Sequence, residues 1–311
     1  MMSEVNLREA DRLEVTVLVD NYTDALLLQD TDVVKRPRSL PPTSLLAEHG
    51  LSCLLKVCVG SEEHVVLMDA SVSSTCLFHN SDVLKRNLGD VESMVLSHGH
   101  FDHFGALVEF LKAEKRINLT LHPDAFLERR LNVPGGRVVD FPTLDEADLM
   151  ENDVEIHKVK EASSLASNLI LVSGEVERVT DFEKGFHWAE AKIGDEWVVD
   201  PFLDDQGVAI KVKGRGLVVI GGCSHSGIIN TVKHVQKVAR MSKIHAVLGG
   251  FHLTGPIFEP IIGTTIEEMR KIGPDFIVPM HCTGWKAINQ FAKAMPNQFF
   301  LNTVGTTYIF Q

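Results

Sequence analysis

Positive charge is scarce in this chain of 311 residues. Lysine and arginine number 30 against 42 aspartates and glutamates, which gives a formal net charge of -12. Because binding to a phosphate backbone draws its affinity from lysine and arginine, this balance disfavours a general nucleic-acid-binding protein. It still allows a phosphorylated small molecule to be held in a local site.

Cysteines and long apolar runs are also few. The five cysteines are an odd number spread along the chain, which does not resemble a disulfide framework. No apolar run approaches the roughly 18 residues of a membrane span, and residues 1–10 lack the apolar region of a secretory signal. We therefore expect a cytoplasmic protein with no membrane partner and a small-molecule substrate. A homodimer is compatible with the sequence.

The order of predicted elements indicates the fold class. Strand-like runs, such as those at 53–59 and 64–69, are followed by alternating strands and helices, which suggests a layered α/β domain. The sequence contains no internal repeat, and we expect one domain over residues 1–311. Residues 117–160 are less regular and contain Pro123, Pro134 and Pro142, so we predict an insertion or a substrate-covering lid there.

Four potential metal ligands lie within six residues, in the segment His98-Gly-His100-Phe-Asp102-His103. The segment directly follows a predicted strand at 93–97. Imidazole and carboxylate groups suit zinc, and manganese or iron less specifically. His98 and His100 can reach one ion while Asp102 and His103 turn to a second, as in sites whose ions lie roughly 3.5–4 Å apart. The segment therefore predicts a centre of two divalent ions, with zinc as the preferred metal.

The pattern His-x-His-x-Asp-His after a buried strand resembles the metallo-β-lactamase superfamily. Three later segments resemble one of its subfamilies, that of the 7,8-dihydropterin-6-methyl-4-(β-D-ribofuranosyl)aminobenzene-5'-phosphate synthase and related bacterial metallo-hydrolases. These segments are 221–230, 249–253 and 279–284. The resemblance spans about residues 13–310. It implies an αββα sandwich of two mixed sheets flanked by helices, with the metal ions in a groove at one edge of the sheets.

The resemblance also implies how the ligands are shared between the two ions. His98 and His100 match the pair that binds the first metal. Asp102 and His103 match the pair that binds the second, and Asp102 could also accept a proton. His281 resembles the last histidine of the superfamily, which is a further ligand of the second metal.

The third ligand of the first metal is harder to assign. Superfamily members usually supply it well upstream of a strand that ends in Gly-Asp or Gly-Gly-Cys, but residues 160–186 contain no histidine and His187 lies in no recognisable motif. We prefer His225, which follows the predicted strand at 217–220. Cys223 would then take the place of the usual bridging aspartate, or be a small buried residue at a strand end.

His252 follows a predicted strand and a Gly-Gly pair that allows a tight turn. Three roles fit it: a metal ligand, an acid or base facing the substrate, or a core histidine bonded to a carbonyl group. We predict that it takes part in catalysis together with Asp102.

Substrate contacts are predicted at two places. Ser224 and Ser226 lead into a predicted helix at 228–241, whose first N–H groups could bind a phosphate. Simple capping of the helix by Ser226 is the alternative. Trp285 could stack on a pterin-like ring, or pack on the core at the start of a helix.

These features favour a metal-dependent hydrolase that acts on a small phosphorylated or pterin-like substrate. A two-metal centre can activate water for attack on a phosphoryl or acyl group. The first alternative is a transferase resembling the pterin synthase, in which pyrophosphate is displaced by an aminobenzene-type nucleophile. The second is a non-catalytic module that binds a metal or a ligand, because a fold does not fix a function.

Overall fold

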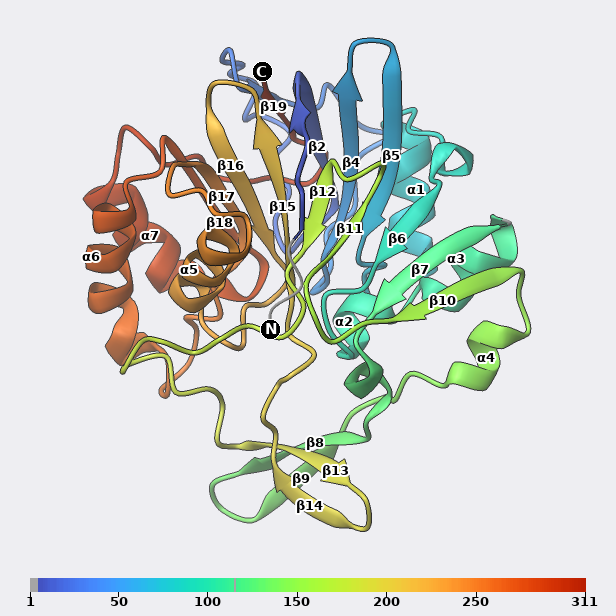
Figure 1. Ribbon diagram of the computed structural model, residues 1–311, viewed down its shortest axis with the longest axis vertical. Coiled ribbons are helices and arrows are strands. Elements are labelled where there is room, and N and C mark those ends of the chain that lie inside the picture. Colours follow the sequence, from blue (N-terminus) through green and yellow to red (C-terminus); the bar gives the residue numbers. More distant parts are fainter. Residues whose placement is uncertain (1–4, 115) are drawn as a thin grey trace.

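The computed structural model describes residues 5–114 and 116–311. Two large β-sheets pack face to face, and helices cover the outer face of each sheet (Figure 1). Fully buried side chains fill the space between the sheets, among them Val17 and Leu55 from one sheet and Ile210 and Ile220 from the other. The predicted αββα sandwich is confirmed.

One large sheet has eight strands in the order β10-β7-β6-β5-β4-β2-β19-β3. Its strands are β2 (Arg12–Val19), β3 (Val34–Lys35), β4 (Ser52–Val59), β5 (Glu62–Met68), β6 (Ser93–Val95), β7 (Ile117–Leu121), β10 (Val154–Lys158) and β19 (Thr307–Phe310). β5, β6, β7 and β10 run parallel to one another. The histidine-rich segment therefore leaves the sheet at the carboxyl end of β6.

The other large sheet has the order β11-β12-β15-β16-β17-β18, and β1 pairs with β15. Its strands are β1 (Glu9–Ala10), β11 (Ser163–Leu165), β12 (Ile170–Val172), β15 (Gly207–Val212), β16 (Gly216–Gly221), β17 (Ile244–Gly250) and β18 (Phe276–Met280). Because β16, β17 and β18 are parallel, their carboxyl ends meet at one edge. Cys223, His252 and His281 follow these three ends.

Helices cover the outer faces through separate apolar clusters. On the eight-stranded sheet lie α1 (Ser74–Val83), α2 (Phe101–Phe104), α3 (Leu107–Ala113) and α4 (Glu146–Met150), with short 3-10 turns at Leu88–Asp90 and Pro123–Phe126. On the other sheet lie α5 (Ile228–Val238), α6 (Ile262–Ile272) and α7 (Trp285–Ala294), with 3-10 turns at Glu259–Ile261 and His281–Thr283. In α5 the buried Ile228, Val232 and Val235 recur at helical spacing and face the sheet.

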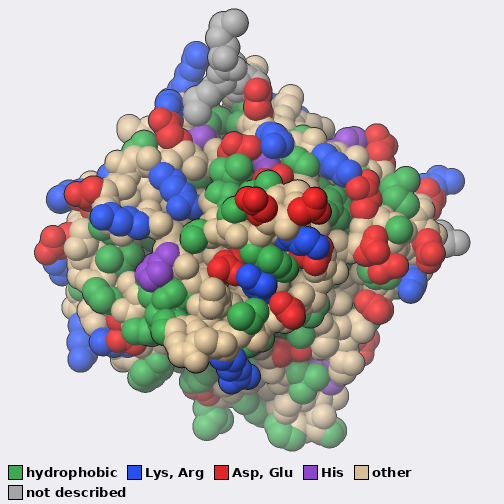
Figure 2. Space-filling model, turned by 90° about the horizontal axis from the view of Figure 1, so that it is seen from below, with side chains coloured by type: hydrophobic (Ala, Val, Ile, Leu, Met, Phe, Trp, Pro, Cys, Tyr) green, Lys and Arg blue, Asp and Glu red, His purple; other side chains and the backbone are tan. Residues whose placement is uncertain are grey.

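A small sheet projects from the sandwich at the bottom of Figure 1. It has the order β14-β13-β8-β9, formed by β8 (Arg129–Val133), β9 (Arg137–Asp140), β13 (Ala189–Ile193) and β14 (Glu196–Val199). The segment 117–160 thus supplies β7 and β10 to a large sheet and β8 and β9 to the small one. Its role as a lid stays a prediction. Seen from this end, acidic and basic side chains are interspersed over the surface (Figure 2).

In the part of the chain that the structure describes, no helix combines the length and the apolar character that crossing a bilayer requires.

Candidate metal centre

The four clustered candidate ligands lie in the turn that follows β6 and in the short helix after it. His98 and His100 precede α2, while Asp102 and His103 lie within this one-turn helix. All four side chains are buried. Glycine is needed at position 99, because the Cβ of any other residue would lie 2.0 Å from the backbone oxygen of Ala125 and clash with it.

The first ligand group joins His98, His100 and His225. Nε2 of His225 lies 3.2 Å from Nε2 of His98 and 3.2 Å from Nδ1 of His100. Burial lowers the pKa of all three rings well below the usual histidine value, so each ring is neutral and keeps a lone pair. The ring of Phe202 stacks on His225 with centroids 4.3 Å apart and fixes its orientation.

This group fits a metal ion. A neutral imidazole has a single N–H, so three nitrogens directed at one point cannot all satisfy one another, whereas a cation accepts all three lone pairs. Ligand nitrogens about 2.0–2.1 Å from a tetrahedral zinc ion would be about 3.3 Å apart. The observed separations of 3.2 Å match that spacing.

The second ligand group contains Asp102, His103, Cys223 and His281, all of them buried. Oδ2 of Asp102 lies 3.3 Å from Nε2 of His281 and 3.8 Å from Nε2 of His103. That His281 nitrogen is buried and has no hydrogen-bond partner among the described residues. Burial alone would raise the pKa of Asp102, but the nearby His103 and His281 hold it far below its usual range. An anionic carboxylate beside two imidazoles is a donor set that suits a second divalent ion.

Cys223 lies between the two groups. Its Sγ is 3.2 Å from Nε2 of His103, and it also forms a group with His225 and His252. The thiol is thus close to donors of both groups, and its role as a bridging ligand stays a prediction. Cys282 lies beside it and donates from Sγ to the Cys223 carbonyl oxygen at 3.4 Å, but belongs to none of the three ligand groups.

Carboxylates behind the ligands hold them in place. Oδ2 of Asp69 is 2.6 Å from Nδ1 of His103, which leaves Nε2 of that ring free to bind a metal. Oδ1 of Asp20 accepts the backbone N–H of His281 at 2.9 Å. Asp69 belongs to no local motif, and only its position after β5 indicates a role. The exposed side chain of His49 also approaches the centre, with its Nε2 3.5 Å from Oδ2 of Asp102.

Arg129 connects the small sheet to the histidine turn. Its guanidinium donates to Asp200 and Asp204 at 2.8 Å each and to the Gly99 carbonyl oxygen at 3.2 Å. The other oxygen of Asp204 accepts the Gly99 N–H at 2.8 Å. The backbone N–H and the carbonyl group of Gly99, the residue between His98 and His100, are therefore both fixed by buried charged side chains.

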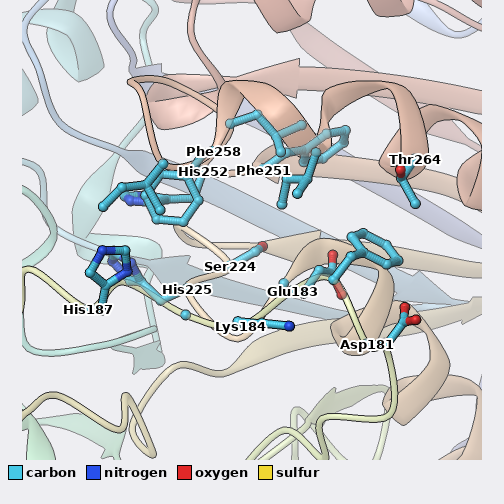
Figure 3. Close-up of a pocket in the computed structure, with 16 residues that line it drawn as sticks. Asp181, Glu183, Lys184, His187, Ser224, His225, Phe251, His252, Phe258 and Thr264 are labelled. Atoms are coloured by element: carbon cyan, nitrogen blue, oxygen red, sulfur yellow. The ribbon is translucent and has the colours of Figure 1, made fainter.

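A cavity of about 580 Å³ opens beside the first ligand group (Figure 3). Figure 3 shows His225, His252 and His187 on one side of it and Glu183, Lys184 and Asp181 on another. The His252 ring lies 4.3 Å from that of His225 and 4.5 Å from that of Phe258, between centroids. His252 thus faces both the ligand group and the cavity. His187 lines the cavity but belongs to none of the ligand groups.

The predicted phosphate site at the start of α5 is occupied by the chain itself. Glu183 accepts the backbone N–H groups of Ile229 and Asn230 at 2.9 and 2.8 Å, and Asp205 accepts that of Ser226 at 2.9 Å. The expectation that these N–H groups are free was wrong, because Glu183 comes from a distant loop that no local pattern connects to α5. Ser226 is buried and does not line the cavity.

The other predicted substrate residues differ in position. Ser224 lines the cavity, and its buried Oγ has no hydrogen-bond partner among the described residues. Trp285 lies outside this cavity: it lines a different pocket of about 220 Å³ with Tyr22 and His281, and 73% of its surface is exposed. Stacking of Trp285 on a ring stays a prediction.

Comparison with known proteins agrees with this architecture. The model of the Metallo-beta-lactamase superfamily matches residues 59–233. The chain is 32% identical over 263 residues to the 7,8-dihydropterin-6-methyl-4-(beta-D-ribofuranosyl)-aminobenzene-5'-phosphate synthase of Methanocaldococcus jannaschii, which covers 81% of this chain and 87% of the relative. It is 33% identical over 266 residues to an uncharacterized protein of the same organism, covering 83% of this chain and 92% of that protein.

Two solved structures share the fold. A metal-dependent hydrolase of the beta-lactamase superfamily superposes with a TM-score of 0.74 and 22% identity, over 95% of this chain and 98% of that one. The metallo-beta-lactamase fold protein YhfI from Bacillus subtilis gives a TM-score of 0.51 with 11% identity, over 96% of this chain and 100% of that one.

Proposed function

Because the chain belongs to the metallo-beta-lactamase superfamily, we propose that it is a two-metal hydrolase acting on a small substrate that carries a phosphate and a pterin-like ring. The observation that carries this proposal is the pair of ligand groups that meet at Cys223 beside a cavity of about 580 Å³. When bound, two divalent ions would supply Lewis-acid stabilisation of the charge that develops on the substrate.

The chain's donors divide between the two ions. His98, His100 and His225 would hold the first, and Asp102, His103 and His281 the second, with Cys223 between them. Imidazole, carboxylate and thiolate together suit zinc better than manganese, because manganese prefers oxygen ligands.

The cavity offers contacts to both parts of such a substrate. Its volume falls within the about 300–1,000 Å³ typical of small-molecule sites. Phe251 and Phe258 supply apolar walls for a planar ring, and Lys184 supplies a positive charge for a phosphate. The unpartnered Oγ of Ser224 adds a hydrogen-bonding group near the ligands.

His252 would act as the general acid that donates a proton to the leaving group. It faces the cavity and is only partly buried, while its Nδ1 is buried and has no hydrogen-bond partner among the described residues. A ring placed between the ligand group and the substrate space can donate a proton to a leaving group. Asp102 would act mainly as a ligand, because its carboxylate lies between His103 and His281.

The hydrolase assignment is tested by steady-state kinetics on phosphodiester, lactone and thioester substrates, with the protein loaded with zinc or manganese. We expect turnover that a chelator abolishes, and a loss of kcat of about 10²–10⁴-fold in His252→Asn. His187→Asn is the matched control, since His187 lines the cavity without joining a ligand group. Absence of metal-dependent turnover on every substrate would refute the assignment.

A transferase is the second candidate, and the 32% identity to the pterin synthase over 81% of this chain favours it. In that reaction an aminobenzene compound would replace water and displace pyrophosphate from a dihydropterin-methyl donor. Incubation of the donor with and without the aryl acceptor separates the two candidates. A pterin–aryl adduct supports the transferase, whereas release of the pterin alcohol in the presence of the acceptor supports the hydrolase.

A further inference from the structure

A second pocket gathers positive charge in this acidic protein. Its volume is about 350 Å³, and it lies between the loop after β3, the end of α1 and the start of β19. The basic residues that line it are Lys35, Arg36, Arg38, Lys85 and Arg86. No acidic side chain lines it among the described residues, and none of its lining residues belongs to the metal ligand groups or to the cavity beside His252.

Arg36 is the most unusual of these residues. Only 9% of it is exposed, its Nη1 donates to the hydroxyl of Thr306 at 3.0 Å, and its buried Nε has no hydrogen-bond partner among the residues that the structure describes. Within residues 5–114 and 116–311, no carboxylate lies within ion-pair distance of its guanidinium. Removing a guanidinium from water is costly unless an opposite charge compensates it. An anion in the pocket would supply that charge.

The other four cations are only weakly neutralised by the chain. Arg38 has an ion pair with Asp30 at 3.3 Å. Arg86 donates to the hydroxyl of Thr307 at 3.3 Å and Lys35 to a backbone oxygen at 3.2 Å, and neither forms an ion pair among the described residues. Asp30 lies near enough to Lys35 for an electrostatic attraction, but it also pairs with Arg38. Lys85 is exposed. The pocket therefore retains most of its positive charge while the molecule as a whole carries -12.

We propose that this pocket binds a small molecule with linked phosphate groups, such as a diphosphate. The cations come from two separate segments, 35–38 and 85–86, and so approach a ligand from two sides. Planar guanidinium groups bind phosphate oxygens in pairs, and lysine ammonium groups add point charges. The volume lies at the lower end of small-ligand sites, which suits a compact polyanion. This site is independent of the proposed function of the metal centre.

Isothermal titration calorimetry of inorganic diphosphate into the metal-loaded protein tests the proposal. In Lys85→Ala/Arg86→Ala we expect one binding event to weaken at least about tenfold, because charge-assisted contacts are lost. Both residues lie at the surface or partly exposed, and a thermal melt verifies that the variant folds. Lys213→Ala/Lys243→Ala removes the same charge from exposed positions elsewhere and should bind like wild type.

The variant His225→Ala distinguishes diphosphate binding in this pocket from binding at the metal centre, because it removes a candidate metal ligand and leaves the basic residues intact. Diphosphate binding that is lost only in His225→Ala, or that is unchanged in Lys85→Ala/Arg86→Ala, overturns the proposal. Orthophosphate should bind at least about tenfold more weakly than diphosphate, and equal affinity would refute the requirement for linked phosphates. Tighter binding of ADP than of diphosphate would identify a nucleotide as the source of the diphosphate group.

Discussion

The carboxylate of Asp204 accepts the backbone N–H of Gly99 at 2.8 Å, at the centre of the turn between His98 and His100. The same carboxylate accepts a hydrogen bond from buried Arg129, which also donates to the Gly99 carbonyl oxygen. The direction of two candidate ligands is thus set by a side chain 105 positions away. Outer residues of this kind orient the ligands that bind a metal.

We predict that Asp204→Asn weakens binding of the first metal ion by about 10–100-fold, because an amide offers only one acceptor for the two donors. Competition with a chelator of known affinity measures the change. Asp200→Asn is the control, since Asp200 binds Arg129 but not Gly99. Equal metal affinity in Asp204→Asn and wild type would contradict a positioning role, whatever the change in thermal stability.

His225→Ala should reduce the metal content of the purified protein from about two equivalents to about one, because only two histidines of the first group remain. Elemental analysis measures this content. His234→Ala provides the control: His234 is also a buried histidine, but its Nε2 is bonded to the Ser173 carbonyl oxygen at 3.1 Å. The prediction fails if both variants keep the metal content of wild type.

Cys223→Ser should remove thiolate coordination while nearly preserving the volume of the side chain. In protein loaded with cobalt, we expect wild type to show a near-ultraviolet thiolate-to-metal absorption band that this variant lacks. Cys282→Ser should keep the band, because Cys282 lies next to Cys223 but outside the ligand groups. A band that persists in Cys223→Ser would exclude the thiol as a ligand.

We predict that titration of the buried Glu183 makes the free energy of unfolding depend on pH. Burial raises its pKa from 4.5 to about 7, even though it accepts two backbone N–H groups of α5. The folded protein then keeps a proton that the unfolded chain releases, so this contribution to stability is complete below about pH 4.5 and is lost as the pH rises towards about 7. In Glu183→Gln, which cannot titrate, the fall in unfolding free energy between about pH 5 and about pH 7.5 should be smaller by about 1–3 kcal/mol.

Urea unfolding at both pH values measures that difference. Glu177→Gln serves as the control, because Glu177 is exposed and pairs with Lys237 at the other end of α5, where its pKa is lowered. An identical pH dependence in wild type and Glu183→Gln would show that Glu183 is ionised throughout this range.

Local sequence determined the parts of this molecule in which neighbours along the chain stay neighbours in space. The segment from His98 to His103 follows a buried strand, so its four donors must leave the sheet at one point. The later motifs follow β16, β17 and β18, and parallel strands bring such segments to a common edge. The superfamily and the αββα architecture could therefore be recognised from residue patterns alone.

Only the tertiary structure decided the contacts between distant segments. That His225, and not His187, lies with His98 and His100 follows from how the segments after β16 and β6, which belong to different sheets, come together. The N–H groups at the start of α5 are bound by Glu183, 46 residues before Ile229. Trp285 and Arg36 likewise have surroundings that no spacing indicates, since Trp285 is 73% exposed and Arg36 is buried at a pocket lined by other basic residues. Periodicity describes which face of an element is buried, but the partner on that face is set by the packing of whole layers.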